Sequence, residues 1–251
     1  MKFTQSLLYR YPEHTLYVSV FGGSGSDILA KEPSKIECFN DIDSNVVSMF
    51  RALRNRQLLA DLKARLWATP YSRTQYGICC RMLQSDKTLT PVTRAWAWFV
   101  ASWQGMTYKT PMTATETNWS NAKSDSRNIR LWRRRIAAIE VAAERFRWVH
   151  LENRSWEEMF KQYDLTTTLF YCDPPYVIST MSNKSNLPYK HMLSDDDHIR
   201  LLDTINKCKG MVILFGFDCD LYQERLQGWT KIEADEKNKT HREFCWVNFA
   251  L

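Results

Sequence analysis

The fold is decided by the stretch Thr168-Leu-Phe-Tyr-Cys-Asp-Pro-Pro-Tyr176. Its first residues carry the apolar and aromatic side chains that are typical of a buried strand. Neither Pro174 nor Pro175 can continue a central sheet, because proline lacks a backbone N–H and has a fixed φ. The strand therefore ends in a stiff loop that begins at Asp173. Since ligands bind at the carboxyl edge of open α/β sheets, the sequence predicts a site in this loop.

The tetrapeptide Asp173 to Tyr176 has the groups needed to methylate an exocyclic amine of a nucleic-acid base. The lone pair of such an amine is delocalised into the ring, so the nitrogen attacks poorly until acceptors bind its N–H groups. The Asp173 carboxylate and the Pro174 carbonyl can be these acceptors, and the proline ring fixes the direction of the carbonyl. The Tyr176 ring offers a flat face for a base turned out of its stack. The alternative is a strand followed by a Pro-Pro turn with a core tyrosine.

The composition indicates a globular α/β protein, built as one large domain or as a domain with a smaller one inserted. The chain has 251 residues, of which 44% are hydrophobic and 25% charged. These values are ordinary for globular proteins and exclude disordered and fibrous classes. The sequence shows no apolar run of membrane-spanning length, no secretory leader and no low-complexity tract. We therefore expect a soluble, intracellular protein with no membrane partner.

The seven cysteines and five histidines form no metal-binding pattern. There is no CxxC, and the histidines are scattered. Cys79 and Cys80 are adjacent and the total is odd, so we expect free thiols in a reducing cytoplasm. Cys172, although it stands beside the acid, is expected to pack within the strand. The sequence thus predicts no metal and no thiolate nucleophile.

The formal charge of +6 is unevenly distributed along the chain. From Arg51 to His150 there are 18 Lys and Arg against 6 Asp and Glu, a net charge of +12, so the remainder carries −6. A basic middle between acidic flanks suggests that the middle meets a polyanion such as nucleic acid. A solvated charged surface is the alternative, and it is less consistent with so large an asymmetry.

A glycine-rich turn follows the first predicted strand, Thr15 to Phe21. Gly22, Gly23 and Gly25 permit a tight turn and a close approach of the backbone to a ligand, as in nucleotide-binding turns between a strand and a helix. A merely flexible turn is the alternative.

A second short strand, Ile36 to Asp41, ends in an acid. A carboxylate there is positioned to accept both ribose hydroxyls of an adenosine-bearing cofactor. The competing interpretation is a helix cap. Asp43 or Ser44 fills that role better for the amphipathic run Val46 to Leu53.

The alternation of strands and helices lapses from Arg56 to Ser126, where prolines break the chain into short pieces. One helix is expected at Arg94 to Trp103. We therefore predict an inserted, mainly helical target-recognition subdomain at residues 57–126, within a catalytic domain formed by residues 1–56 and 127–251.

Arginines gather around this middle region. A long helix is expected from Arg127 to Phe146, and its arginines either follow DNA phosphates or form a solvated face. The residues that we expect to contact DNA are Arg94, Arg127, Arg130, Arg133, Arg134 and Tyr189.

The α/β alternation then resumes. The expected elements are strands at 147–151, 211–217, 231–234 and 244–249 and helices at 156–163 and 221–226. Ser194 begins another helix, and Asp195, Asp196 and Asp197 complement the dipole of its first turn, so these acids need no metal. Together the elements predict a Rossmann-like methyltransferase sheet with helices on both faces.

Several segments, in this order, resemble the Dam-type DNA adenine methyltransferases, and most of all their bacterial and phage branch. They are Phe21-Gly-Gly-Ser-Gly25, Asn40-Asp-Ile-Asp43, Asp173-Pro-Pro-Tyr176, Tyr189-Lys-His191, the helical segment Asp197-His-Ile-Arg-Leu-Leu, Lys209-Gly-Met-Val-Ile-Leu and Glu243-Phe-Cys-Trp-Val-Asn248. An aspartate at the head of the tetrapeptide is typical of adenine enzymes, whereas cytosine enzymes usually have serine.

The resemblance implies a seven-stranded sheet and the transfer of a methyl group from S-adenosylmethionine to adenine N6 in double-stranded DNA. It implies no metal and no covalent enzyme intermediate. The cytoplasm of a bacterium or of a phage-infected host would be its location, with restriction-modification or phage protection among its roles. The residues implied to contact the cofactor are Phe21, Gly22, Gly23, Gly25, Asp41, Ile42, Trp156 and Asp173. Asp173, Pro174 and Pro175 would form the acceptor loop, and Tyr176 would stack on the flipped adenine.

The sequence also departs from the family pattern. Ser19 stands where the family has an acid, and the region around Thr4 and Gln5 offers no counterpart of an amino-terminal Gly-Gly-Lys. Met181 replaces an expected arginine, and Phe215-Gly-Phe217 replaces a Ser-Gly-Tyr. These departures support a second hypothesis, a DNA-binding protein of methyltransferase fold whose catalysis is weakened or lost.

Overall fold

The computed structural model describes residues 11–85, 88–106, 118–120, 127–180, 190–233 and 243–251. Tyr189, Met181 and the segment around Thr4 and Gln5 lie outside these residues. The chain divides into two compact units: the first comprises 1–42, 149–185 and 191–251, and the second 43–148 and 186–190. Each unit is described by itself.

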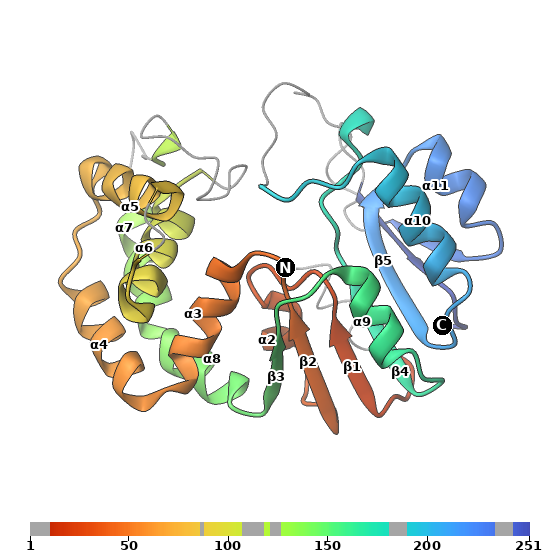
Figure 1. Cartoon of the computed structure of the whole chain (residues 1–251), viewed down its shortest axis with the longest axis horizontal. Coiled ribbons are helices and arrows are strands. Elements are labelled where there is room, and N and C mark those ends of the chain that lie inside the picture. Colours follow the sequence, from red (N-terminus) through yellow and green to blue (C-terminus); the bar gives the residue numbers. More distant parts are fainter. Residues whose placement is uncertain (1–10, 86–87, 107–117, 121–126, 181–189, 234–242) are drawn as a thin grey trace. The chain divides into compact units, whose positions relative to one another are not determined.

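A seven-stranded sheet organises the first unit, with strand order β3-β2-β1-β4-β5-β7-β6 (Figure 1). The pairs among β1 to β5 are parallel, and β7 is antiparallel to both of its neighbours. This is the Rossmann-like α/β sheet that the sequence predicts, flanked by helices. The strands are β1 Leu16–Ser19, β2 Ile36–Asn40, β3 Val149–Glu152, β4 Thr168–Cys172, β5 Met211–Phe217, β6 Thr230–Glu233 and β7 Glu243–Val247.

Helices α9 (Trp156–Tyr163), α10 (Asp195–Ile205) and α11 (Asp220–Arg225) belong to the same unit, together with the short α2 (Ser26–Ala30). Figure 1 shows α9 and α10 on one face of the sheet. Alternate strand residues point to this face, so Val18 and Phe170 join Phe160 and Leu201 in one buried cluster. The rings of Phe160 and Phe170 are 4.4 Å apart, which places the core directly beneath the organising strand.

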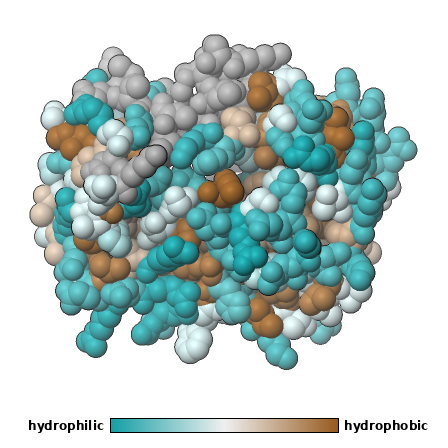
Figure 2. Space-filling model, viewed as in Figure 1, coloured by the Kyte–Doolittle hydropathy of each residue, from teal (hydrophilic) through white to brown (hydrophobic). Residues whose placement is uncertain are grey.

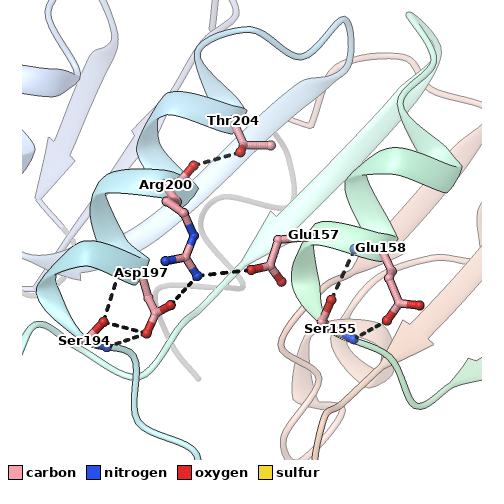
Figure 3. Close-up of polar contacts among 7 residues, drawn as sticks. All are labelled: Ser155, Glu157, Glu158, Ser194, Asp197, Arg200 and Thr204. Carbon is pink, nitrogen blue, oxygen red and sulfur yellow. Dashed lines mark hydrogen bonds and ion pairs between the residues drawn. The ribbon is translucent and has the colours of Figure 1, made fainter.

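Both α9 and α10 begin with a capping box (Figure 3). The Ser155 hydroxyl accepts from the Glu158 backbone N–H at 3.4 Å, and the Glu158 carboxylate accepts from that of Ser155 at 3.1 Å. Ser194 and Asp197 repeat the arrangement at 3.1 and 2.9 Å. The acids at the start of α10 are therefore helix-capping residues, as predicted.

Arg200 links the two capped helices (Figure 3). Its guanidinium lies 2.5 Å from Asp197 on its own helix and 3.4 Å from Glu157 on α9. The hydrogen bonds of Ser194 are the main reason that the pKa of Asp197 is lowered, and Arg200 adds to the effect. The starts of both helices are thus fixed near the carboxyl edge of the sheet.

The second unit is helical among its described residues. Its helices are α3 Ser44–Arg54, α4 Arg56–Trp67, α5 Arg73–Ser85, α6 Pro91–Gln104, α7 Arg127–Ala137 and α8 Ile139–Phe146. Helix α6 packs against α3, α4, α5 and α7, because its Trp96, Trp98 and Phe99 are buried. The unit extends beyond the predicted segment 57–126 on both sides, and a target-recognition role for that segment stays a prediction.

Two expectations about the second unit are wrong in detail. The predicted helix from Arg127 to Phe146 is two helices that meet at Ala138. Its apolar residues continue at helical spacing across that point, and no glycine or proline marks the break. The two halves have different partners, since α7 packs on α4 and α6 whereas α8 packs on α3. The short pieces expected after Arg56 are complete helices, α4 and α5.

A few large hydrophobic residues are exposed in the part of the chain that the structure describes. None of the described helices is long and apolar enough to cross a membrane. On the face in Figure 2, hydrophobic residues form small separate areas among hydrophilic ones. Among the described residues, Trp67 and Trp148 are the most exposed large hydrophobic ones, at 76% and 82%. Scattered residues of this kind are normal on globular proteins.

Candidate active site

The carboxyl ends of β1, β2 and β4 meet at one edge of the first unit's sheet. Strand β1 pairs with β2 on one side and with β4 on the other. The strand order therefore reverses at β1, and open α/β sheets bind ligands at such a topological switch point. The Val20 N–H donates to the Tyr171 carbonyl at 3.0 Å, which extends the ladder between β1 and β4. The turn after β1 and Asp173 after β4 are thereby neighbours.

The glycine turn is built for close approach. A Cβ on Gly22 would lie 2.2 Å from the Phe39 ring, and the Gly22 N–H donates to the Asn40 carbonyl at 2.7 Å. Gly23 and Gly25 have φ of 52° and 65°, which non-glycine residues adopt only at a cost. A Cβ on Gly23 would meet no atom of the described residues within 4 Å, so the outer side of the turn is open with respect to them.

Asp41 belongs to this turn. Its carboxylate accepts from the Gly23 N–H at 2.8 Å and thereby joins the ends of β1 and β2. The Asn153 amide donates to the carbonyls of Asp41 and Ile42 at 2.7 and 3.1 Å. The helix cap of α3 is Asp43. The cap interpretation of Asp41 is therefore wrong, and its position fits a ligand-binding edge.

Asn40 is a buried residue that the sequence reasoning missed. Its amide donates to the Val20 carbonyl at 2.9 Å and to the Arg154 carbonyl at 3.1 Å, and its oxygen accepts from the Arg154 N–H at 2.9 Å. From the end of β2, this side chain thus fixes Val20 after β1 and Arg154 after β3. A polar residue at the end of an otherwise buried strand was the available signal.

Asp173 follows β4 directly and has an exposed surface. Neighbouring protein atoms nevertheless crowd the carboxyl group, and this desolvation raises its pKa to about 7, with further contributions from Glu243 and Asp27. A hydrogen bond with Tyr176 acts in the opposite direction. A carboxyl group that titrates near neutrality at the edge of a sheet is typical of an active site.

Tyr176 is half-buried and fixed at two points. Its hydroxyl donates to Oε1 of Glu243. Its ring meets Phe217 edge-on, with centroids 4.4 Å apart and planes at 65°. Glu243 begins β7 and Phe217 ends β5, and the two are paired across the ladder. Tyr176 is therefore attached to the β5 and β7 pair, which the sequence did not reveal.

His198 is a second residue that the sequence reasoning missed. It is fully buried in α10, with Nδ1 3.2 Å from the Tyr222 hydroxyl. Burial lowers its pKa, whereas Asp195 and the Pro175 backbone oppose this shift. A neutral histidine thus lies beneath the acceptor loop. It lies in one of the segments that resemble the family, but the sequence does not indicate that its side chain is buried.

The family model of the D12 class N6 adenine-specific DNA methyltransferases matches residues 2–240. The chain belongs to this family. The match includes the glycine turn, Asp41 and the tetrapeptide from Asp173 to Tyr176, so the predicted relationship is confirmed. Among curated proteins, none matches the chain.

Trp156 has a packing role in this methyltransferase. It is the first residue of α9 and only 7% exposed, and its ring meets Phe160 edge-on at 6.4 Å. Phe21 is half-buried against the same core cluster. The contacts of both residues with the cofactor stay predictions.

The methyltransferase has another acid beside the glycine turn that the sequence reasoning did not identify. Asp27 is 3% exposed, accepts from the Tyr17 hydroxyl at 3.0 Å, and burial raises its pKa. Ser19, where the family has an acid, is fully buried. Asp27 on α2 is thus one of the two acids that raise the pKa of Asp173, after Glu243 on β7.

The predicted DNA contacts in the described residues all lie in the second unit. Four of them are exposed on α7: Arg127, Arg130, Arg133 and Arg134. Arg94 is half-buried on α6 and donates to the Asn45 side chain at 2.9 Å, which gives it a structural role. DNA contact by these residues remains a prediction, and Tyr189 lies outside the described part.

The cysteines of the methyltransferase are all free. Burial raises the pKa of the Cys172 thiol well above its usual value, which agrees with the predicted packing role. Within the described residues, no group of three or more His, Cys, Asp or Glu side chains could hold a metal ion.

Proposed function

We propose that this methyltransferase transfers a methyl group from S-adenosylmethionine to N6 of an adenine that is turned out of double-stranded DNA at a specific site. Membership of the family gives adenine-N6 methylation of DNA. The donor, the flipped base and the residue roles are our proposal. The position of Asp173 and Pro174, next to the glycine turn at the edge of the sheet, supports it most directly.

The residues around the glycine turn fit an adenosine-bearing cofactor. The open space beside Gly23 allows a ligand to approach the backbone, and Asp41 stands at the end of the neighbouring strand, where a carboxylate can accept ribose hydroxyls. Phe21, Gly22 and Gly25 shape the turn and Ile42 is exposed next to Asp41. When bound, S-adenosylmethionine supplies an activated methyl group on a sulfonium.

The acceptor loop prepares the adenine amine. Ionised Asp173 accepts one N–H and the Pro174 carbonyl accepts the other, which draws electron density onto the nitrogen. Pro175 keeps the loop stiff, and Tyr176 presents a ring on which the base stacks. Because burial raises the pKa of Asp173 to about 7, about half of the carboxyl groups are ionised at that pH, and acceptance increases above it and declines below it.

The charge of the second unit supports DNA as the substrate. Residues 43–148 and 186–190 contain 19 Lys and Arg against 7 Asp and Glu, a net charge of +12. Exposed Arg133 and Arg134 on α7 are suited to phosphate contacts. We propose that this unit holds the DNA and includes the region that recognises the target.

The test is methylation of duplex DNA with isotopically labelled S-adenosylmethionine, followed by digestion to nucleosides. Label is expected in N6-methyladenine and absent with Asp173→Ala. The control is Glu224→Ala, which removes an exposed acid on α11 and is expected to leave the labelling unchanged. Absence of label in conditions where the protein binds DNA would contradict the proposal.

Ser19 favours a second candidate, a DNA-binding protein with weakened or lost catalysis. A hydroxyl replaces the acid of the family, and it is fully buried. Calorimetry with S-adenosylmethionine distinguishes the candidates, because stoichiometric heat with a low micromolar or tighter affinity contradicts this one.

A further inference from the structure

The reversed strand β7 brings a carboxylate to the acceptor loop. Strands β4 and β5 are parallel, and their carboxyl ends lie at the same edge. Since β7 is antiparallel to β5, its first residue lies at that edge. That residue is Glu243, paired with Phe217 at the end of β5. The fold thus places Glu243 beside a loop 67 residues earlier in the chain.

The Tyr176 hydroxyl has one proton and two carboxyl groups within reach. It donates to Oε1 of Glu243, and its hydrogen bonding with Asp173 lowers the pKa of that group. A hydroxyl donates to one acceptor at a time. The Tyr176 hydroxyl is therefore shared between Glu243 and Asp173.

The same contact fixes the Tyr176 ring. A tyrosine side chain has two rotatable bonds, and contacts at both its hydroxyl and its ring restrict them together. Phe217 meets the ring edge-on at 4.4 Å, and Glu243 holds the phenol oxygen. Both partners come from the paired ends of β5 and β7, so the ring orientation is set by the sheet.

We propose that Glu243 is a positioning residue of the methyl-transfer site, which holds the Tyr176 hydroxyl so that the ring is oriented for the target base. This inference rests on the proposed function. Glu243 acts through Tyr176 and need not touch the substrate.

The charge of Glu243 has a separate effect on Asp173. The ionisable groups that act on Asp173 or respond to it among the described residues are Glu243, Asp27, Tyr176, Cys172 and Tyr222. Beyond desolvation, Glu243 is the largest contributor that raises the pKa of Asp173, whereas the hydrogen bond of Tyr176 lowers it. Removing the charge and removing the hydroxyl therefore shift this pKa in opposite directions.

The first experiment is the pH dependence of single-turnover methylation. The acid limb of the wild type is expected to have a midpoint near pH 7. Glu243→Gln moves the midpoint to lower pH, because it removes a negative charge. Tyr176→Phe moves it to higher pH, because it removes the hydrogen bond. Glu224→Gln makes the same charge change on an exposed part of α11 and leaves the midpoint in place.

The second experiment is a double-mutant cycle with Glu243→Ala and Tyr176→Phe. Each variant is expected to lower kcat/KM on the order of tenfold, as for the loss of a hydrogen bond to a charged group. The kcat/KM of the double variant is expected to be little lower than that of either single variant, because both changes remove the same contact. Thermal unfolding without DNA or cofactor tests the same contact. The Tm shift of the double variant is expected to be smaller than the sum of the two single shifts.

The outcomes separate this inference from the proposed function. Additive Tm shifts, or pH midpoints that move in the same direction, overturn the role of Glu243 even if the wild type methylates DNA. A wild type that binds DNA but transfers no methyl group overturns the proposed function, and the role of Glu243 in positioning the base falls with it. Opposite pH shifts together with less than additive losses support both.

Discussion

The two compact units differ in architecture and in charge. The first is an α/β sheet whose residues carry a net charge of −6, and the second is helical among its described residues and carries +12. At the carboxyl edge of the sheet the site residues include Asp27, Asp41, Asp173 and Glu243. Acceptors for an amine require negative charge, whereas a phosphate backbone requires positive charge. In the proposed function, separate units of one chain therefore meet opposite electrostatic demands.

The strongest test of this division is Asp173→Ala. Loss of a preorganised partner of the reacting group is expected to lower kcat by about 100- to 1,000-fold, with DNA affinity unchanged within about twofold because the second unit keeps its charge. Methylation rates and DNA titrations measure the two effects. A parallel loss of DNA affinity would contradict the separation of the two roles, since Asp173 would then contribute to DNA binding as well.

Gly22→Ala tests whether close packing holds the site of the α/β unit. The new Cβ would lie 2.2 Å from the Phe39 ring and 2.7 Å from the Asn40 carbonyl, so the free energy of unfolding is expected to fall by about 1–3 kcal/mol. The matched variant is Gly23→Ala, where space is open but φ is 52°, and a loss of about 1 kcal/mol is expected. Denaturant unfolding measures the loss of stability in both variants. A smaller loss for Gly22→Ala than for Gly23→Ala would be inconsistent with the close packing of Gly22.

The charge of the helical unit is tested by replacing Arg133 and Arg134 with alanine together. DNA affinity is expected to fall roughly tenfold at physiological salt, and the salt slope to become shallower by about 2. The control removes the exposed Lys207 and Lys209 from the first unit and leaves both quantities nearly unchanged. Titrations at several salt concentrations measure both quantities. Equal losses of DNA affinity from the arginine pair and the lysine pair would contradict the proposal that the second unit holds the DNA.

Ser194→Ala is expected to give the smallest effect. It removes the hydroxyl that accepts from the Asp197 N–H at 3.1 Å, and such caps contribute about 1 kcal/mol. Thr204→Ala, which deletes an exposed hydroxyl of the same helix, changes stability by less than about 0.5 kcal/mol. Thermal unfolding compares the two. Equal losses would mean that the capping box does not stabilise the start of α10.

Local signals explain what the sequence could predict. The strand before Asp173 ends where the prolines begin, and Ser155 and Ser194 cap helices that start at the next residue. The break at Ala138 was missed because an uninterrupted apolar pattern gives no local sign that two halves pack on different partners.

The site was predictable only in part for a related reason. The residues that end β1, β2 and β4 stand beside strands, so the topology of parallel sheets places them together. Glu243 and His198 contact the acceptor loop from distant parts of the chain, and no periodicity specifies such contacts. The pKa of Asp173 likewise depends on Glu243 and Asp27, which only the folded chain brings near it.

The place of β7 in the sheet has a consequence for synthesis. This strand is the seventh in chain order but lies between β5 and β6, so it must enter a gap that its neighbours leave open until late. A nascent chain that has not yet reached residue 243 exposes an unpaired side of β5 and leaves Tyr176 without its carboxylate partner. The contact that orients the Tyr176 ring can therefore form only after synthesis has passed residue 243.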